Sequence, residues 1–194
     1  MAKRIFDIVF SLVVLFFSFP IFIIAAVMIK VDSPGPIIFK QRRVGKNGRI
    51  FMILKFRTMK MATGSLITAA GDARISRAGK LLRRTNFDEL PQFINIVKGD
   101  MSVVGPRPEI PELVMHYAPW QREILCFRPG FTSFATVKFL HEERLLEKKE
   151  LMEFYLNEVL PRKIKYDLEY FRGRTNLIDD LSIILRTIGG TLNE

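Results

Sequence analysis

The chain has 194 residues, and its 30 lysines and arginines against 20 aspartates and glutamates give a formal net charge of +10. Hydrophobic residues make up 48% of the sequence and the mean hydropathy is +0.15, so the chain is both basic and apolar. This combination fits a protein held at an anionic membrane surface better than a solvated nucleic-acid binder. The single cysteine, Cys126, excludes an intramolecular disulfide and a thiolate metal cluster. The chain has only two histidines, His116 and His141, so a histidine-based triad or zinc site is not expected.

The first long apolar segment covers residues 5–29 and is interrupted only by Asp7, Ser11 and Ser18. At about 1.5 Å per residue, a helix of this length can cross a hydrocarbon core of roughly 30 Å. It is too long for the core of a signal peptide, and no small-residue cleavage site follows it. We therefore expect this segment to be retained and inserted in a membrane.

From the residues alone, two geometries fit this membrane segment equally well. Pro20 lies near its middle and removes one backbone hydrogen bond, while Ser18 can bond back to a carbonyl group and assist a bend. Basic residues flank both ends, whereas a spanning helix carries its excess of them on the cytoplasmic side. A re-entrant hairpin with both ends on the cytoplasmic face and a kinked spanning helix both stay open.

The rest of the chain, beyond a Ser-Pro-Gly-Pro stretch at 33–36, predicts mixed helices and strands. Strand patterns at 37–42 and 49–56, joined through an Asn-Gly dipeptide, indicate a β-hairpin, and residues 61–75 have the composition of a loop. Amphipathic helices are expected at 76–84, 90–98, 145–160 and 176–188. The prediction is an α+β chain, mainly helical, with a membrane segment at 1–32 and one compact domain at 33–194.

The adjacent carboxylates Asp88 and Glu89 allow a structural and a catalytic interpretation. The structural one is a capping box, with Asn86 as the N-cap residue and Glu89 as the third helical residue. Taken alone, it is the more ordinary explanation of such a pair. A surplus of cations in the surrounding motifs favours catalysis, namely Lys55, Arg57, Arg83, Arg84, Arg107 and Arg128.

Two of these cations, Arg107 and Arg128, stand beside prolines in "GPRP" and "RPG". Prolines restrict the backbone, so both guanidinium groups are expected to be pre-organised for phosphate oxygens. A carboxylate among fixed cations should stay ionised at neutral pH. It could then attack a phosphorus atom or bind a magnesium ion through its oxygens.

The motifs together resemble those of the bacterial sugar transferases, specifically the small monotopic polyprenyl-phosphate phosphoglycosyl transferases. The resemblance runs almost unbroken from Lys3 to Gly130, and the chain is about the size of the family's minimal catalytic unit. The matching stretches are "KRIFDIVFS", "SPGPIIFKQRRVGKNG", "FMILKFRTM", "DARISRAGKLLRRTNFDELPQFINIVKGDMSVVGPRP" and "RPG".

This resemblance implies that Asp88 is a nucleophile and a ligand of Mg²⁺, and that Glu89 assists it. Asp88 would attack the β-phosphate of a UDP-sugar, release UMP and pass the phosphosugar to a polyprenyl phosphate such as undecaprenyl phosphate. The cations assigned to substrate phosphates by charge and motif are Lys55, Arg57, Arg84, Arg107 and Arg128. The resemblance also implies a re-entrant hairpin, broken at Ser18 and Pro20, in the lipid bilayer of the bacterial inner membrane. The active site would face the cytoplasm, with amphipathic helices lying at the interface.

The chain departs from the family pattern at two places. Ser18 and Pro20 are separated by Phe19, where the family commonly has adjacent Ser and Pro. The segment "TSFATV" at 132–137 replaces the family's "TGLAQV", so no sugar-specific residue is carried over.

Two rival hypotheses are a basic, membrane-tethered binder of lipid or nucleic acid and a scaffold without catalysis. The sequence lacks the aromatic–basic interleaving of a nucleic-acid module, so no nucleic-acid partner is expected. No dimer interface is evident from the residues, and a homodimer stays open.

Overall fold

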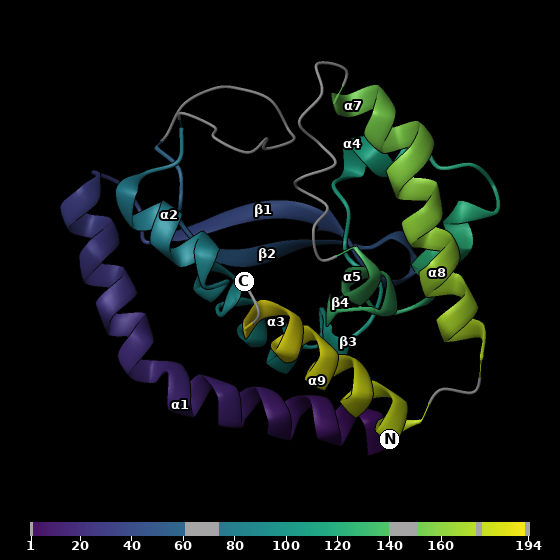
Figure 1. The fold of residues 1–194 in the computed structure, drawn as a ribbon, viewed down its shortest axis with the longest axis horizontal. Helices are drawn as coiled ribbons and strands as arrows, with labels where there is room; N and C mark the ends of the chain where they lie inside the picture. Colours follow the sequence, from purple (N-terminus) through teal and green to yellow (C-terminus); the bar gives the residue numbers. More distant parts are fainter. Residues whose placement is uncertain (1, 61–73, 140–150, 174–175, 193–194) are drawn as a thin grey trace.

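The computed structural model describes residues 2–60, 74–139, 151–173 and 176–192 (Figure 1). In chain order its elements are α1 (Ala2–Asp32), β1 (Ile38–Val44), η1 (Lys46–Gly48), β2 (Ile50–Phe56), α2 (Arg77–Arg84), η2 (Phe87–Glu89), α3 (Gln92–Lys98), β3 (Ser102–Val104), α4 (Pro111–Val114), η3 (Gln121–Cys126), β4 (Gly130–Thr132), α5 (Phe134–Lys138), α7 (Leu151–Phe154), η4 (Tyr155–Val159), α8 (Leu160–Arg172) and α9 (Leu177–Leu192). The strands form two sheets, β1–β2 and β3–β4, each of two strands. The prediction of a mainly helical α+β fold is confirmed.

The apolar helix α1 changes direction partway along its length (Figure 1). Pro20 lies inside the helix and has no N–H to donate to the carbonyl group of Phe16. The Ser18 hydroxyl donates to the carbonyl oxygen of Val14 at 2.7 Å, which is the kind of bond expected from the sequence. A proline and an inserted hydroxyl are ordinary causes of such a bend.

Both halves of α1 pack against the same folded body. Apolar side chains of the first half, including Phe6 and Phe10, contact the core around α3 and β3. In the second half, Ala25 and Ile29 are buried together with Phe56 of β2 and a leucine of α2. A straight helix of 31 residues would be roughly 45 Å long, so the bend is what returns its two ends to one body.

The outward face of α1 is apolar and exposed. Within the described residues, α1 is the one helix long and apolar enough to cross a membrane, and most of it is not buried. The exposed side chains on it are Ile5, Val9, Leu12, Val13, Phe16, Phe17, Phe19, Ile23, Ile24, Val27 and Val31.

Polar contacts fix the first turns of α1 to the elements around the candidate site. Asp7 is 1% exposed and accepts hydrogen bonds from Ser102 Oγ at 2.8 Å and from the backbone N–H of Val103 at 3.1 Å. Arg4 Nη1 donates to the carbonyl oxygen of Ile96 at 2.6 Å. The helix therefore bonds directly to β3 and to the end of α3.

The antiparallel pair β1–β2 confirms the predicted hairpin. The Asn-Gly dipeptide forms its turn, with left-handed φ angles of 56° at Asn47 and 76° at Gly48. Ile53 of β2 is buried against a core that includes Phe93 of α3. The hairpin is thereby placed across the start of α3.

The parallel pair β3–β4 was not predicted. Gly105 and Gly130 allow their two backbone segments to lie unusually close. A Cβ atom added to Gly130 would be 2.0 Å from the Gly105 nitrogen. The backbone N–H of Gly130 donates to the carbonyl oxygen of Pro106 at 2.9 Å. The "GPRP" and "RPG" loops, which the sequence marks separately, are therefore packed together.

The predicted helices at 76–84, 90–98 and 176–188 correspond to α2, α3 and α9. The helix predicted at 145–160 is helical from residue 151, where its description begins, and continues through the π turn η4 into α8. Most of the loop predicted at 61–75 lies outside the described residues. α9 packs beside the first half of α1 and leaves Ile178, Leu181, Leu185 and Ile188 exposed (Figure 1).

Candidate active site

Asp88 and Glu89 lie on η2, a single 3-10 turn between α2 and α3. The chain enters this turn through Asn86, whose φ of 55° is left-handed, and α3 begins just after Pro91. An N-cap asparagine normally has an extended backbone and accepts a hydrogen bond through its side chain. Asn86 makes no such side-chain bond, so the capping-box interpretation of Asn86 and Glu89 is wrong.

Two cations hold the Glu89 carboxylate. Its Oε1 atom lies 2.5 Å from Lys55 Nζ and 3.5 Å from Arg107 Nη2. Lys55 comes from β2 and Arg107 from the loop after β3, so three distant segments of the chain meet at this oxygen. The structure thus brings together Lys55, Glu89 and Arg107, which the sequence analysis had placed in one site.

Asp88 is in a different environment from its neighbour. Its side chain is buried, and the whole residue is 8% exposed. Among the described residues, no ion pair joins the Asp88 carboxylate to a cation, whereas both close cations bond to Glu89.

The two carboxyl groups consequently have pKa values shifted in opposite directions. Burial raises the pKa of Asp88 to about 6, the charge of Glu89 adds to this, and Lys55 and Arg83 oppose it. Burial also acts on Glu89, but Lys55 and Arg107 together outweigh it and lower the pKa of Glu89 to about 2. The expectation that cations hold the nucleophilic carboxylate ionised is therefore met by Glu89 and not by Asp88. Asp88 still carries a charge at pH 7, because that pH is above its pKa.

Arg57 lies outside this cluster, and its assignment to the substrate phosphates stays a prediction. The residue is 4% exposed, and its guanidinium donates to the carbonyl oxygens of Pro34 at 2.6 Å and Ser33 at 2.7 Å. These carbonyl groups follow the end of α1, where positive charge is favourable. Arg57 is therefore bound to the C-terminal end of the apolar helix α1.

Arg84 and Arg128 form no ion pair with the Asp88–Glu89 pair among the described residues. Arg84 is exposed on α2, and Arg128 is half-buried just before β4. Their assignment to substrate phosphates stays a prediction.

Two other arginines, left out of the predicted phosphate-binding set, lie near the carboxylates. Arg83 Nε donates to Thr58 Oγ1 at 2.9 Å, and its charge lowers the pKa of Asp88. Arg43, on β1, contributes in the same way to the lowered pKa of Glu89. The sequence did contain a signal that could have identified Arg43, because strand alternation puts Arg43 and Lys55 on the same face of the hairpin.

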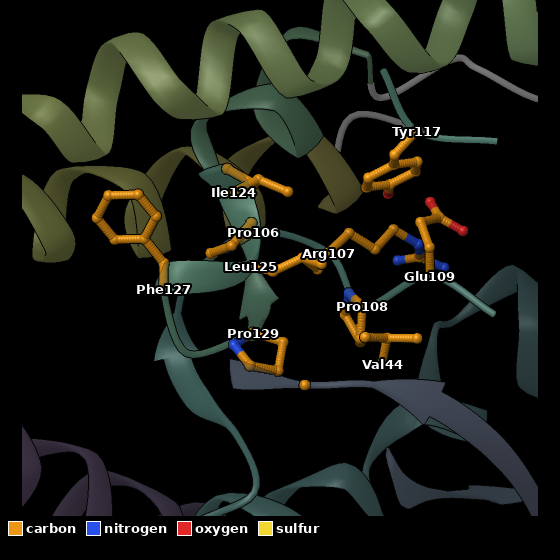
Figure 2. Close-up of a pocket in the computed structure, with 11 residues that line it drawn as sticks. Val44, Pro106, Arg107, Pro108, Glu109, Tyr117, Ile124, Leu125, Phe127 and Pro129 are labelled. Atoms are coloured by element: carbon orange, nitrogen blue, oxygen red, sulfur yellow. The ribbon is translucent and has the colours of Figure 1, made fainter. Parts of the chain in front are cut away.

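A small cavity lies behind the "GPRP" loop, lined by Arg107, Glu109 and Tyr117 among others (Figure 2). Its volume is about 20 Å³, which is the size for one water molecule. A nucleotide cannot fit there, so this cavity is not a binding site for the donor.

The whole chain, residues 1–194, matches the family described as bacterial sugar transferase. The chain belongs to this family. Its match to the UDP-glucose:undecaprenyl-phosphate glucose-1-phosphate transferase of Escherichia coli K12 is 35% identical and covers 99% of the chain and 40% of that protein. The exopolysaccharide production protein PSS of Rhizobium leguminosarum is 38% identical, over 99% of the chain and 96% of that protein.

A third relative is the UDP-N-acetylgalactosamine-undecaprenyl-phosphate N-acetylgalactosaminephosphotransferase of Aeromonas hydrophila. It is 42% identical over 70% of the chain and 33% of its own length. The chain thus spans about two fifths of the E. coli relative and one third of the Aeromonas relative. The names of these relatives include two different sugars.

The chain's own residues fit a magnesium ion only in part. Within the described ranges, no group of three or more His, Cys, Asp or Glu side chains could hold a metal ion by itself. Mg²⁺ is commonly bound through one or two carboxylates together with substrate phosphates. The Asp88 carboxylate, which forms no ion pair with a described cation, fits such a ligand.

Proposed function

We propose that this bacterial sugar transferase is a phosphoglycosyl transferase that moves a sugar 1-phosphate from a UDP-sugar to a polyprenyl phosphate such as undecaprenyl phosphate. UMP is the second product, and the reaction is the first membrane step in assembling a glycan. The observation that carries the proposal is the unequal carboxylate pair, a buried Asp88 beside a Glu89 held by Lys55 and Arg107. The names of the relatives support the same class of donor and acceptor.

In the first step, an Asp88 oxygen attacks the β-phosphorus of the donor. The bond from that phosphorus to the oxygen bridging the two phosphates breaks, and its electron pair leaves with UMP. The product is a mixed anhydride of Asp88 and the sugar phosphate. Burial raises the free energy of the ionised carboxylate, and bond formation removes that charge from the buried position.

In the second step, a phosphate oxygen of the polyprenyl phosphate attacks the same phosphorus and Asp88 leaves as a carboxylate. A covalent intermediate lets a water-soluble donor and a membrane-dissolved acceptor use one site in turn. If the lipid phosphate is doubly ionised, the charges of substrates and products balance without a proton transfer. No general base is then required.

Glu89 is assigned the positioning of cations. Its lowered pKa of about 2 makes it a weak base, which argues against removal of a proton from the lipid phosphate. Its contacts instead hold Lys55 and Arg107 beside Asp88, where phosphate charge must be neutralised. A Mg²⁺ ion bound by Asp88 and the diphosphate would add to this neutralisation.

For the membrane segment we propose a re-entrant hairpin that keeps both ends of α1 on the cytoplasmic face of the inner membrane. The bend at Pro20 and the packing of both halves on one body support it. The exposed apolar faces of α1 and α9 lie on neighbouring helices, so α9 is proposed to rest in the interface. The proposed reaction requires that Asp88 then lie near the depth of the lipid phosphate.

Release of UMP by purified protein in nanodiscs tests the proposed function. Undecaprenyl phosphate, Mg²⁺ and a panel of UDP-sugars would be supplied to wild type and Asp88→Asn, with UDP-glucose and UDP-N-acetylgalactosamine in the panel. We expect release with at least one donor, and at least about 10³-fold less release in the variant because its nucleophile is gone. Turnover by Asp88→Asn near the wild-type rate would exclude the proposed role of Asp88.

A further inference from the structure

Tyr155 begins the π turn η4, between α7 and α8, and its hydroxyl reaches the segment after the "GPRP" loop. Tyr155 donates to Glu109 Oε1 at 2.8 Å, and both residues are buried. Pro161 cannot donate to the carbonyl group of Asn157, so the regular helical bonding is interrupted at this position. Single π turns in helices are frequent at functional sites. This turn brings the Tyr155 hydroxyl to Glu109, which is two residues after Arg107.

Glu109 in turn faces Arg43 of β1. Arg43 Nη1 lies 3.6 Å from Glu109 Oε2 and donates to the carbonyl oxygen of Pro108 at 3.0 Å. Arg43 Nη2 donates to Gln41 Oε1 at 2.8 Å. The guanidinium is therefore held from two sides, and one of its bonds is made to the backbone immediately next to Arg107.

Glu109 and Arg107 act on the charge of Arg43 in opposite directions. Burial lowers the pKa of Arg43, Glu109 raises it, and the nearby charge of Arg107 lowers it again. The charge of Arg107 disfavours the Arg43 cation, so the Glu109 carboxylate offsets the cost of holding Arg43 against the loop. Removing the Tyr155 hydroxyl would withdraw one hydrogen bond that orients this carboxylate.

We infer that Tyr155 and Glu109 are positioning residues for the donor, which act by holding Arg43 against the Pro108 carbonyl group and so fixing Arg107 for the donor's diphosphate. The inference rests on the proposed function, because it assigns Arg107 to a nucleoside-diphosphate substrate. It adds a role for the C-terminal helices, which otherwise have no described contact with the carboxylate pair. Tyr155 touches no reacting atom in this scheme.

The kinetic test compares Tyr155→Phe with Tyr166→Phe. The second substitution removes the same atom from α8, where the tyrosine hydroxyl has no hydrogen bond among the described residues. We expect Tyr155→Phe to raise the donor KM by about 3- to 10-fold with kcat within about twofold, and Tyr166→Phe to change neither. A smaller folded fraction would lower kcat and leave KM alone. An unchanged donor KM in Tyr155→Phe would overturn the inference.

A double-mutant comparison tests whether the effect passes through Arg107. The dissociation constant of UDP, used as the diphosphate probe, would be measured by calorimetry in the wild-type and Arg107→Ala backgrounds. Tyr155→Phe should weaken UDP binding in the first background and have little further effect in the second. Equal weakening in both backgrounds would contradict action through Arg107.

Hydrogen–deuterium exchange of residues 105–110 separates this inference from the proposed function, since it needs no turnover. Tyr155→Phe should speed exchange in this segment, and Tyr166→Phe should not. If no donor is turned over by wild type, the proposed function fails and the positional claim is still decided by this result. Unchanged exchange in Tyr155→Phe would overturn the positional claim even when turnover is normal.

Discussion

Asp88 and Glu89 are adjacent in the chain, but the residues around them make them chemically different. Lys55 and Arg107 bond to Glu89, so that carboxylate stays ionised far below neutral pH. Asp88 is buried next to this charge, and its pKa is raised to about 6. A pair of carboxylates whose pKa values are pushed apart can divide two tasks between them, and the tasks we propose are attack by Asp88 and organisation of cations by Glu89.

The raised pKa of Asp88 predicts a stability effect with a definite sign. Because the folded state binds this proton more tightly than the unfolded state, the group stabilises the fold below about pH 4, and this contribution is lost as the pH rises through about 6. Asp88→Asn removes the buried charge. We therefore expect the variant to be more stable than wild type at pH 7.5, by on the order of 2 kcal/mol.

Thermal unfolding of both proteins in the same detergent, at pH 4 and at pH 7.5, measures this effect. The difference should shrink at the lower pH, where wild-type Asp88 is protonated. A variant less stable than wild type at pH 7.5 would show that the Asp88 charge is compensated in the fold.

The sequence placed Lys55, Glu89 and Arg107 in one site, as the structure does, but it did not give the direction of every side chain. Adjacent helical residues such as Arg83 and Arg84 point about 100° apart, and only the packing of α2 decides which one faces Asp88. Strand alternation would have placed Lys55 and Arg57 on one face. The strand ends at Phe56, and Arg57 turns instead to the end of α1.

At the scale of elements, the local patterns were sufficient for the hairpin and most helices. Alternation, an Asn-Gly turn and helical periodicity depend on neighbouring residues, and these elements are present as predicted. The β3–β4 pair could not be predicted in this way, since strands of three residues are too short for alternation to mark them in the sequence. Its two strands are distant in the chain and meet through backbone hydrogen bonds and the close approach of Gly105 and Gly130.

The attachment of β2 to α1 through Arg57 gives a prediction at this scale. Arg57→Ala removes buried, charge-assisted hydrogen bonds to Ser33 and Pro34, so we expect the free energy of unfolding to fall by about 2–3 kcal/mol. Arg84→Ala, at an exposed position on α2, should change it by less than about 0.5 kcal/mol.

Thermal unfolding and the donor KM would be measured for both variants. A wild-type melting temperature with a raised donor KM in Arg57→Ala would support the predicted role of Arg57 in binding substrate phosphates. A raised KM with normal stability in Arg84→Ala would support the predicted role of Arg84.

At the scale of the whole molecule, the two ends of α1 hold different parts of the site. The first turns bond to β3 and α3, which flank the arginine loop and follow the carboxylate pair. The other end is bonded by Arg57, just after the strand that carries Lys55. The helix is thus part of the scaffold of the site, and a straight spanning helix could not make both sets of contacts.

Cysteine labelling tests the re-entrant arrangement. The exposed Cys126 marks the side of the folded domain, and Ala2→Cys in a Cys126→Ser background marks the start of α1. A membrane-impermeant maleimide should label both cysteines in inside-out vesicles and neither in intact sphaeroplasts. Labelling of the two cysteines from opposite sides would show that α1 spans the membrane.

The central claim is that Asp88 becomes covalently attached to the phosphosugar, and intact-protein mass spectrometry tests it most directly. Wild-type protein would be mixed with Mg²⁺ and the active UDP-sugar without lipid acceptor, then digested to locate any adduct. The account predicts added mass equal to one sugar phosphate on the peptide containing Asp88, lost when undecaprenyl phosphate is added and absent from Asp88→Asn. Steady turnover with no adduct on Asp88, or an adduct on another residue, would contradict it.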